Sequence, residues 1–125
     1  FFRNMQDAVN LYHTSTLLIP VETKNGVHAI SATDIIVVEA AERKVMVFTV
    51  QKSYESVRNM AYWLDTLPKS CFFQTHRSFI VNFEHIVDFD HSTVHLSNPQ
   101  ITAYLTRRKY SSFKNAYLLY LESMR

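Results

Sequence analysis

The sequence predicts a mainly β domain with short helices, on three observations. Short runs of β-branched and aromatic residues, such as 35–38 and 79–81, are typical of buried strands. Turn signals separate these runs, among them Asn25-Gly26, the strongest local signal for a hairpin. Helical spacing of apolar residues is confined to a few segments. The length of 125 residues is sufficient for one domain with its own core.

The first half of the chain predicts one helix followed by four strands. Apolar spacing predicts an amphipathic helix over residues 1–12, and we expect residues 1–15 to be a linker or flanking helix. Residues 17–22 and 27–31 flank the Asn25-Gly26 turn and predict a hairpin. A polar turn at 31–34 leads to strands at 35–38 and 45–50, which a charged connection joins. We therefore place the main domain at residues 16–125.

The second half predicts the remaining helices and strands. Residues 53–67 carry apolar side chains at helical spacing and end at Pro68, which predicts a helix. From Lys109 onward the apolar spacing is helical again. Strands are predicted at 72–73, 79–81, 86–89, 93–96 and 101–105, with a hairpin turn at 90–92. The whole chain then has about eight short strands and two or three helices.

Composition excludes several classes of protein. Gly26 is the only glycine, so the glycine-rich phosphate loops of Walker and dinucleotide-binding motifs are excluded. Cys71 is the only cysteine, which rules out an internal disulfide and favours a reducing, cytoplasmic location. No apolar run approaches the roughly 20 residues that span a bilayer, so we expect no membrane contact. Because the chain begins at Phe1 without a Met, we expect a piece of a longer protein.

Charge is unevenly distributed along the chain. The 13 basic and 11 acidic residues give a net charge of +2, which alone is too small to indicate nucleic-acid binding. Bases outnumber acids in residues 100–123, whereas residues 84–90 contain acids and neither Lys nor Arg. This distribution is compatible with one basic and one acidic face, and equally with an ordinary solvated surface.

Two interpretations as a metal site or an enzyme have little support. His91 and His95 share one face of an extended strand near two aspartates, but no zinc-type spacing accompanies them, so we expect a solvated hairpin without metal. Cys71 and His76 suggest a thiol nucleophile and its base, yet five positions along a strand place them on opposite faces. We therefore expect no catalytic residue, no cofactor and no small-molecule substrate.

Cations and hydroxyl groups gather on three connections between the predicted elements. Arg is the residue type that forks onto guanine edges or phosphate oxygens, and a strand-to-helix junction suits phosphate contacts. Each connection alone is more typical of an ordinary solvated loop, but their joint occurrence favours DNA binding. The candidate residues are Arg43 and Lys44 on the first connection, His76, Arg77 and Ser78 on the second, and Tyr104, Thr106, Arg107, Arg108 and Lys109 on the third.

At these residues the sequence resembles a LytTR DNA-binding domain, the output module of a class of bacterial response regulators. The most specific match is the run from Phe73 to Asn82, with His-Arg-Ser followed by an aromatic residue and Ile-Val-Asn. Further matches are Lys24-Asn25-Gly26, residues 34–40, Tyr54, residues 57–67, Ile86-Val87 and residues 106–110. The likeness covers residues 17 to 121 in unbroken order.

The resemblance implies an elongated, β-rich fold of small stacked sheets that contacts DNA through loops and not through a recognition helix. It implies base contacts from three connections in successive major grooves. The middle contact falls on Arg77 and the C-terminal one on Arg108, whereas Arg43 and Lys44 are the chemically suitable residues of the first connection. The neighbours of these residues then position the protein on the DNA backbone: Tyr104, Thr106, His76 and Ser78. Asn82 is expected to be a buried structural amide.

We therefore predict a sequence-specific, non-enzymatic domain that binds double-stranded DNA in a bacterial transcriptional regulator. Because members of the family bind as pairs, the resemblance also implies repeated sites and a homodimer on DNA. The alternative is a protein-interaction or dimerisation module that uses the aromatic residues near both ends, Phe1, Phe2, Tyr12, Tyr117 and Tyr120. Gel shift on duplex DNA beside sizing chromatography separates the two.

Overall fold

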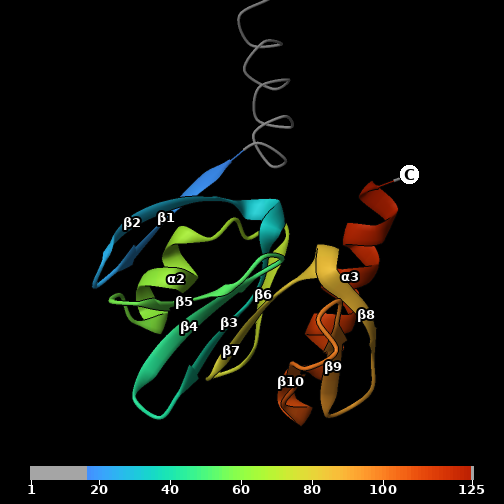
Figure 1. Ribbon diagram of the computed structural model, residues 1–125. Helices are drawn as coiled ribbons and strands as arrows, with labels where there is room; N and C mark the ends of the chain where they lie inside the picture. Colours follow the sequence, from blue (N-terminus) through green and yellow to red (C-terminus); the bar gives the residue numbers. More distant parts are fainter. Residues whose placement is uncertain (1–16, 125) are drawn as a thin grey trace, which may run out of the picture.

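The computed structural model describes residues 17–124 of the 125-residue chain. The predicted helix at residues 1–12 lies outside the described residues. Ten strands and two α-helices make up most of the described chain (Figure 1). They are β1 (Leu18–Thr23), β2 (Gly26–Ser31), β3 (Ile35–Ala41), β4 (Lys44–Thr49), β5 (Ser53–Ser56), α2 (Met60–Thr66), β6 (Phe72–His76), β7 (Phe79–Asn82), β8 (Ile86–Phe89), β9 (Thr93–Leu96), β10 (Thr102–Tyr104) and α3 (Tyr110–Ser123), with 3-10 helices η1 (Ala32–Asp34), η2 (Phe83–His85) and η3 (Arg107–Lys109).

The predicted mainly β fold of small sheets is confirmed. The strands form a two-stranded sheet, a three-stranded sheet in the order β10-β9-β8 and a five-stranded sheet in the order β5-β4-β3-β7-β6, and all of their pairings are antiparallel. The hairpin expected at Asn25-Gly26 joins β1 to β2, where Gly26 has a φ of 138° that residues with a side chain rarely adopt.

One predicted element is wrong at its start. The helix expected over residues 53–67 occupies only α2, and Ser53–Ser56 forms strand β5 on the edge of the five-stranded sheet. The helix begins only after Asn59, which is its N-cap. The Asn59 side-chain oxygen accepts a hydrogen bond from the Tyr62 N–H at 2.9 Å. Val57, which the apolar spacing placed on the helix, lies before the cap and is 55% exposed.

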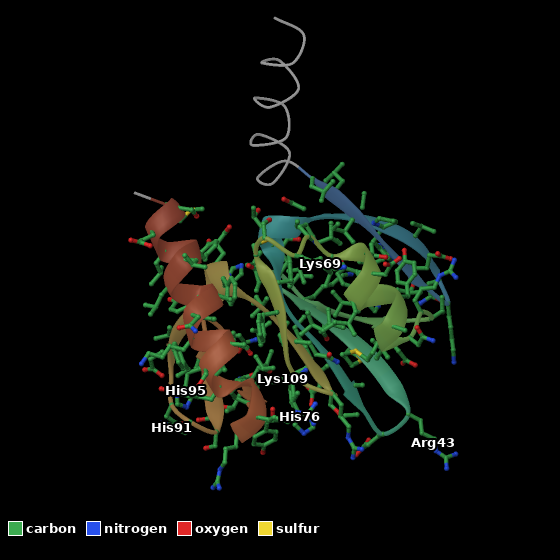
Figure 2. All side chains as sticks on the ribbon, turned by 180° about the vertical axis from the view of Figure 1, so that it is seen from behind. Arg43, Lys69, His76, His91, His95 and Lys109 are labelled. Carbon is green, nitrogen blue, oxygen red and sulfur yellow. The ribbon has the colours of Figure 1, made fainter. Side chains whose placement is uncertain are left out.

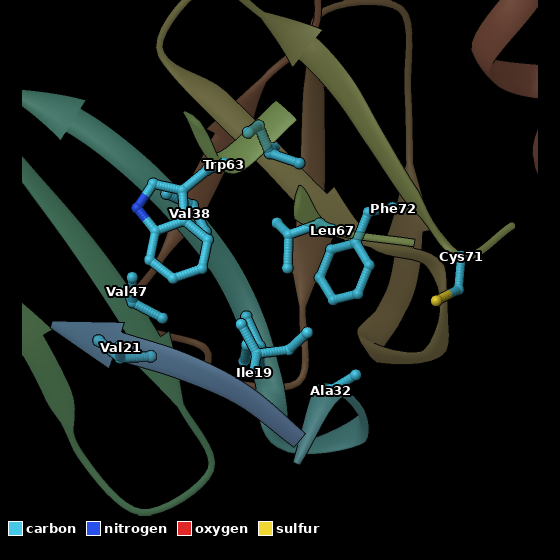
Figure 3. Packing of buried hydrophobic residues seen from close by; sticks show 11 residues of the cluster. Ile19, Val21, Ala32, Val38, Val47, Trp63, Leu67, Cys71 and Phe72 are labelled. Atoms are coloured by element: carbon cyan, nitrogen blue, oxygen red, sulfur yellow. The ribbon is translucent and has the colours of Figure 1, made fainter. Parts of the chain in front are cut away.

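Two apolar clusters cover the two faces of the five-stranded sheet. The first packs β1 and α2 against one face around the fully buried Trp63 (Figure 3). The Trp63 indole N–H donates to Ser56 Oγ at 3.0 Å. The second packs α3 and the three-stranded sheet against the other face around Phe113. A bulge between Ile35 and Val37 interrupts the alternation of β3, so Ile36 and Val37 both belong to the second cluster.

Asn82 joins β7 to the start of β3, as expected of a buried structural amide. Its side chain is 1% exposed and donates to the carbonyl oxygens of Ile35 at 2.8 Å and Ala32 at 3.3 Å. Its Oδ1 accepts from the Glu84 N–H, which caps η2. No helix in the part of the chain that the structure describes is long and apolar enough to cross a bilayer.

Candidate nucleic-acid interface

The three connections that carry the candidate residues lie at one end of the molecule. The β3–β4 and β6–β7 turns are adjacent because the Ala40 N–H donates to the Ser78 carbonyl oxygen at 2.9 Å. The third connection, from β10 into η3, lies beside the second one. Figure 2 shows Arg43, His76 and Lys109 toward this same end. We call this surface, made of residues 42–44, 76–78 and 104–109, the loop face.

The β3–β4 turn is strained. Its two central residues, Glu42 and Arg43, have φ values of 54° and 64°, a region that costs residues with a Cβ about 1–2 kcal/mol each. Positive φ at both positions is typical of the turns that match the twist of a two-residue hairpin. Both side chains are exposed, as is Lys44, so this turn presents two cations to solvent.

The β6–β7 turn places Arg77 on the surface and fixes His76. The Ser78 N–H donates to His76 Nδ1 at 3.0 Å, so this ring nitrogen is an acceptor and Nε2 carries the proton. The imidazole packs edge-on against Phe79 and Tyr104, with centroid distances of 6.0 and 6.5 Å. His76 therefore presents a donor on a ring whose orientation is fixed, beside an exposed guanidinium.

The third connection turns from β10 into α3 through η3. Thr106 caps η3 because its hydroxyl oxygen accepts from the Lys109 N–H at 3.2 Å. Arg107 and Arg108 are exposed. Lys109 is half-buried, and its Nζ donates to the carbonyl oxygen of Gln74 at 3.1 Å and to its Oε1 at 3.3 Å. Burial, and secondarily the charge of Arg108, lower the pKa of Lys109.

A groove of about 350 Å³ joins the second and third connections. Its lining residues are Gln74, His76, Arg77, Thr106, Arg108 and Lys109. The guanidinium-bearing side chains of Arg77 and Arg108, which are 31 positions apart in the sequence, thus share one surface. Arg43 and Lys44 lie on the neighbouring turn and Arg107 on η3, outside this lining. The arrangement offers two planar, permanently charged donors in an open groove, a geometry suited to base edges or phosphates.

The sequence did not identify the junction that holds these two connections together. Thr75 is fully buried, and its hydroxyl donates to the Tyr104 carbonyl oxygen at 2.7 Å. The Thr106 N–H donates in return to the Thr75 carbonyl oxygen at 3.0 Å. The available signal was a hydroxyl residue in a strand that begins with two phenylalanines, which is too general to single out this position.

The thiol site suggested by Cys71 and His76 is not assembled. Cys71 precedes β6 and His76 ends it, so they lie at opposite ends of the strand. Cys71 is buried, its Sγ lies 3.9 Å from the Pro68 carbonyl oxygen, and burial raises the pKa of the thiol to about 11. The thiolate needed by a nucleophile is therefore disfavoured.

The histidines of the β8–β9 hairpin have other partners. His95 Nδ1 is hydrogen-bonded to Asp88, and the His91 ring stacks on Tyr110 at a centroid distance of 4.2 Å. Among residues 17–124 no group of three His, Cys, Asp or Glu side chains is placed to hold a metal ion. Both histidines are thus exposed side chains of the hairpin that contact neighbouring residues.

Comparison with known proteins identifies a matching family and several similar regulatory proteins. The family described as the LytTr DNA-binding domain matches residues 25–117. The sensory transduction protein LytR of Staphylococcus epidermidis is 33% identical over 76 residues, which cover 61% of the chain and 30% of that protein. The transcriptional regulatory protein NatR of Bacillus subtilis is 28% identical over 104 residues, which cover 79% of the chain and 45% of that protein. The chain thus spans less than half the length of these relatives.

A solved structure has the same fold. It is a LytTr DNA-binding domain from Bacillus cereus, and the superposition covers 81% of the chain and 95% of that domain with a TM-score of 0.66. The sequence identity is 24%, so this likeness establishes the arrangement of the elements and leaves the roles of single side chains to the geometry of the loop face.

Proposed function

The chain belongs to the LytTr DNA-binding domain family, and from this premise we propose that its loop face binds double-stranded DNA in a sequence-specific manner. The domain acts within a bacterial transcriptional regulator and carries out no chemical reaction itself. The observation that carries the proposal is the convergence of Arg77 and Arg108 on one groove. Two guanidinium groups from separate turns then meet one DNA surface.

Arg77 and Arg108 are the base-contacting residues of the proposal. Each presents a planar fork that matches the O6 and N7 acceptors of guanine in the major groove, and such a pair discriminates against other bases by about 1–3 kcal/mol. Both side chains are exposed, so neither has to break a buried contact to reach DNA. The strained β3–β4 turn contributes Arg43 and Lys44 as the third set of contacts.

Phosphate contacts set the register of the protein on the duplex. The Lys109 ammonium has three donors, and because Gln74 accepts two of them the third remains for a phosphate oxygen. A nearby phosphate also opposes the loss of charge that burial promotes at this lysine. The other residues in this role are Tyr104, Thr106, Ser78, His76 and Arg107.

Selection of bound sites from a random duplex library tests the proposal. We expect one enriched motif with two conserved guanine positions that depend on Arg77 and Arg108. With about five neutralised phosphates, log K should fall against log salt concentration with a slope of roughly −4 to −5. A library that returns no enriched motif, at salt concentrations where the domain still binds DNA, contradicts sequence-specific recognition.

Self-association through α3 is a second candidate function, and it accounts for binding of repeated sites by two copies. Four apolar side chains near the end of the helix are at least 44% exposed: Leu118, Leu119, Leu121 and Met124. Leu118 and Leu121 are one helical turn apart, and exposed apolar neighbours on a helix favour an interaction surface. Sizing chromatography tests it: Leu118→Glu should shift a dimer to monomer, whereas Ser111→Glu, exposed near the start of α3, should not.

A further inference from the structure

We propose that Thr75 is a positioning residue that sets the spacing between the Arg77 and Arg108 contacts and so the number of base pairs between the two bases they read. This inference rests on the proposed function. Thr75 itself is fully buried and does not touch DNA. It acts through the two connections that it joins.

The position of Thr75 in β6 is irregular. Gln74 pairs with Ile80 and His76 with Phe79, so Thr75 is an extra residue that bulges out of the β6–β7 ladder. The bulge lies two residues before Arg77 and on an edge strand of the five-stranded sheet. A bulge turns the peptide and side chain of its extra residue away from the ladder. Thr75 therefore has both its hydroxyl and its carbonyl oxygen available for the segment that follows β10.

Three kinds of hydrogen bond cross from β6 to the third connection. The Thr75 hydroxyl donates to the Tyr104 carbonyl oxygen at 2.7 Å, and the Thr106 N–H donates to the Thr75 carbonyl oxygen at 3.0 Å. Lys109 Nζ adds its two bonds to Gln74. We call these contacts the Thr75 junction. They bracket Arg108 between Thr106 and Lys109, so the segment that carries Arg108 is attached to the strand that carries Arg77.

This junction is needed because the connections that carry Arg77 and Arg108 extend from different sheets. The β6–β7 turn belongs to the five-stranded sheet, and β10 is the edge strand of the three-stranded sheet. No ladder of strand pairing joins β6 to β10 in the described chain. Because the Tyr104 carbonyl oxygen is only partly buried, removal of the Thr75 hydroxyl leaves it to find another donor, such as water, and the third connection loses this attachment to β6 and shifts.

The decisive variant is Thr75→Val, which keeps the shape of the side chain and removes its hydroxyl. Thr75→Ser retains the hydroxyl and serves as the rescue. Thr49→Val is the matched control, because Thr49 is also buried in a strand and its hydroxyl also donates to a carbonyl oxygen, that of Lys52, at 2.7 Å. Thr49 ends β4 at the end opposite to the loop face.

The experiment measures how strongly binding depends on the spacing between the two contacted bases in the duplex. A selected duplex is compared with one that has a single base pair inserted between the positions that Arg77→Ala and Arg108→Ala identify. One added base pair moves the second base by about 3.4 Å along the axis, so the wild-type protein should prefer the parent duplex about tenfold or more. In Thr75→Val this preference should fall about threefold or more, and in Thr75→Ser and Thr49→Val it should stay within about twofold of wild type.

Each result decides one of the two proposals. If the wild type selects no motif, the proposed function fails. If it selects a motif and folded Thr75→Val keeps the full spacing preference, or Thr49→Val loses it equally, the positioning role is overturned and DNA recognition stands. Should Thr75→Val not fold, Gln74→Leu removes only the side-chain acceptor of Lys109 and must lower the spacing preference in the same direction. An unchanged preference in folded Gln74→Leu then overturns the proposal.

Discussion

The side-chain amide of Asn82 donates a hydrogen bond of 2.8 Å to the carbonyl oxygen of Ile35, 47 positions earlier in the chain. The same amide also reaches Ala32, and its oxygen caps η2. One buried side chain thus satisfies backbone groups at the start of β3 and after β7, the two strands that lead to the first two turns of the loop face.

Replacing Asn82 should destabilise the whole domain. Asn82→Ala leaves buried carbonyl oxygens without a donor, so we expect a loss of about 2–3 kcal/mol in the free energy of unfolding. Urea denaturation followed by circular dichroism measures it. Asn115→Ala, on the exposed face of α3, is the control and should change stability by less than about 0.5 kcal/mol. Equal stability of the two variants contradicts a structural role for Asn82.

Arg108→Ala should flatten base preference at one position of the recognised site. The expected cost is about 1–3 kcal/mol for the preferred duplex, and less for duplexes that lack the contacted base. Binding selections on both proteins measure it. Lys114→Ala removes an exposed cation of α3 outside the groove and should leave the motif unchanged. If Arg108→Ala retains both preference and affinity, Arg108 is not part of the site.

The strained β3–β4 turn predicts opposite effects on stability and binding. Arg43→Gly should raise the free energy of unfolding by about 0.5–1 kcal/mol, because glycine adopts positive φ without the steric cost. It should also weaken DNA binding, since the cation is lost. Glu42→Gly should stabilise the fold to a similar degree without weakening binding. Thermal melts and titrations of duplex DNA separate the effects, and equal affinities of the two variants remove Arg43 from the interface.

Asp90 predicts a pH-dependent contribution to stability. Hydrogen bonds from the Ser92 and Thr93 N–H groups, followed by the Thr93 hydroxyl, lower the pKa of Asp90 to about 2. Because the pKa is lower in the folded state, the stabilisation is complete above the unfolded-state pKa of about 4 and is lost as the pH falls through 2. The difference in unfolding free energy between wild type and Asp90→Ala should therefore shrink from pH 4 to pH 2. A constant difference over that range contradicts the assignment.

Cys71 should be inert in the folded protein. Because burial raises its pKa to about 11, the thiolate is scarce at neutral pH, and a disulfide reagent should label Cys71 only when the chain unfolds. Labelling rates with and without urea measure this. Rapid labelling of the native protein would show that Cys71 is accessible, and Cys71→Ser should leave DNA binding intact.

The sequence predicted the elements whose signals are local. Asn25-Gly26 marked the first hairpin, and the β-branched run at 35–38 marked the buried strand at the centre of the five-stranded sheet. Residues 53–56 were misassigned because Tyr54 is the single strand-favouring residue among two serines and Glu55, and pairing with β4 decides their conformation. Tertiary contacts therefore override the local preference at this edge.

The membership of the candidate site stays a prediction, and what the sequence did not predict is the set of contacts that joins its second and third connections. Arg77 and Arg108 follow from the chemistry of the connections and from the family resemblance, and the structure places both on one groove. The Thr75 junction depends on a bulge and on the meeting of two sheet edges, neither of which leaves a periodic trace in the sequence. Similarly, the positive φ of Glu42 and Arg43 is imposed by the two-residue hairpin and not by residues that favour it.

The pairing of β3 with β7 has a consequence for how such domains diversify. Their hydrogen-bond ladder makes the first two turns of the loop face a rigid unit, whereas the third turn is attached to that unit by the seam between β6 and β10. If the proposed function holds, substitutions along this seam would alter the spacing between the two contacted bases, while the pairing of β3 with β7 would stay as it is.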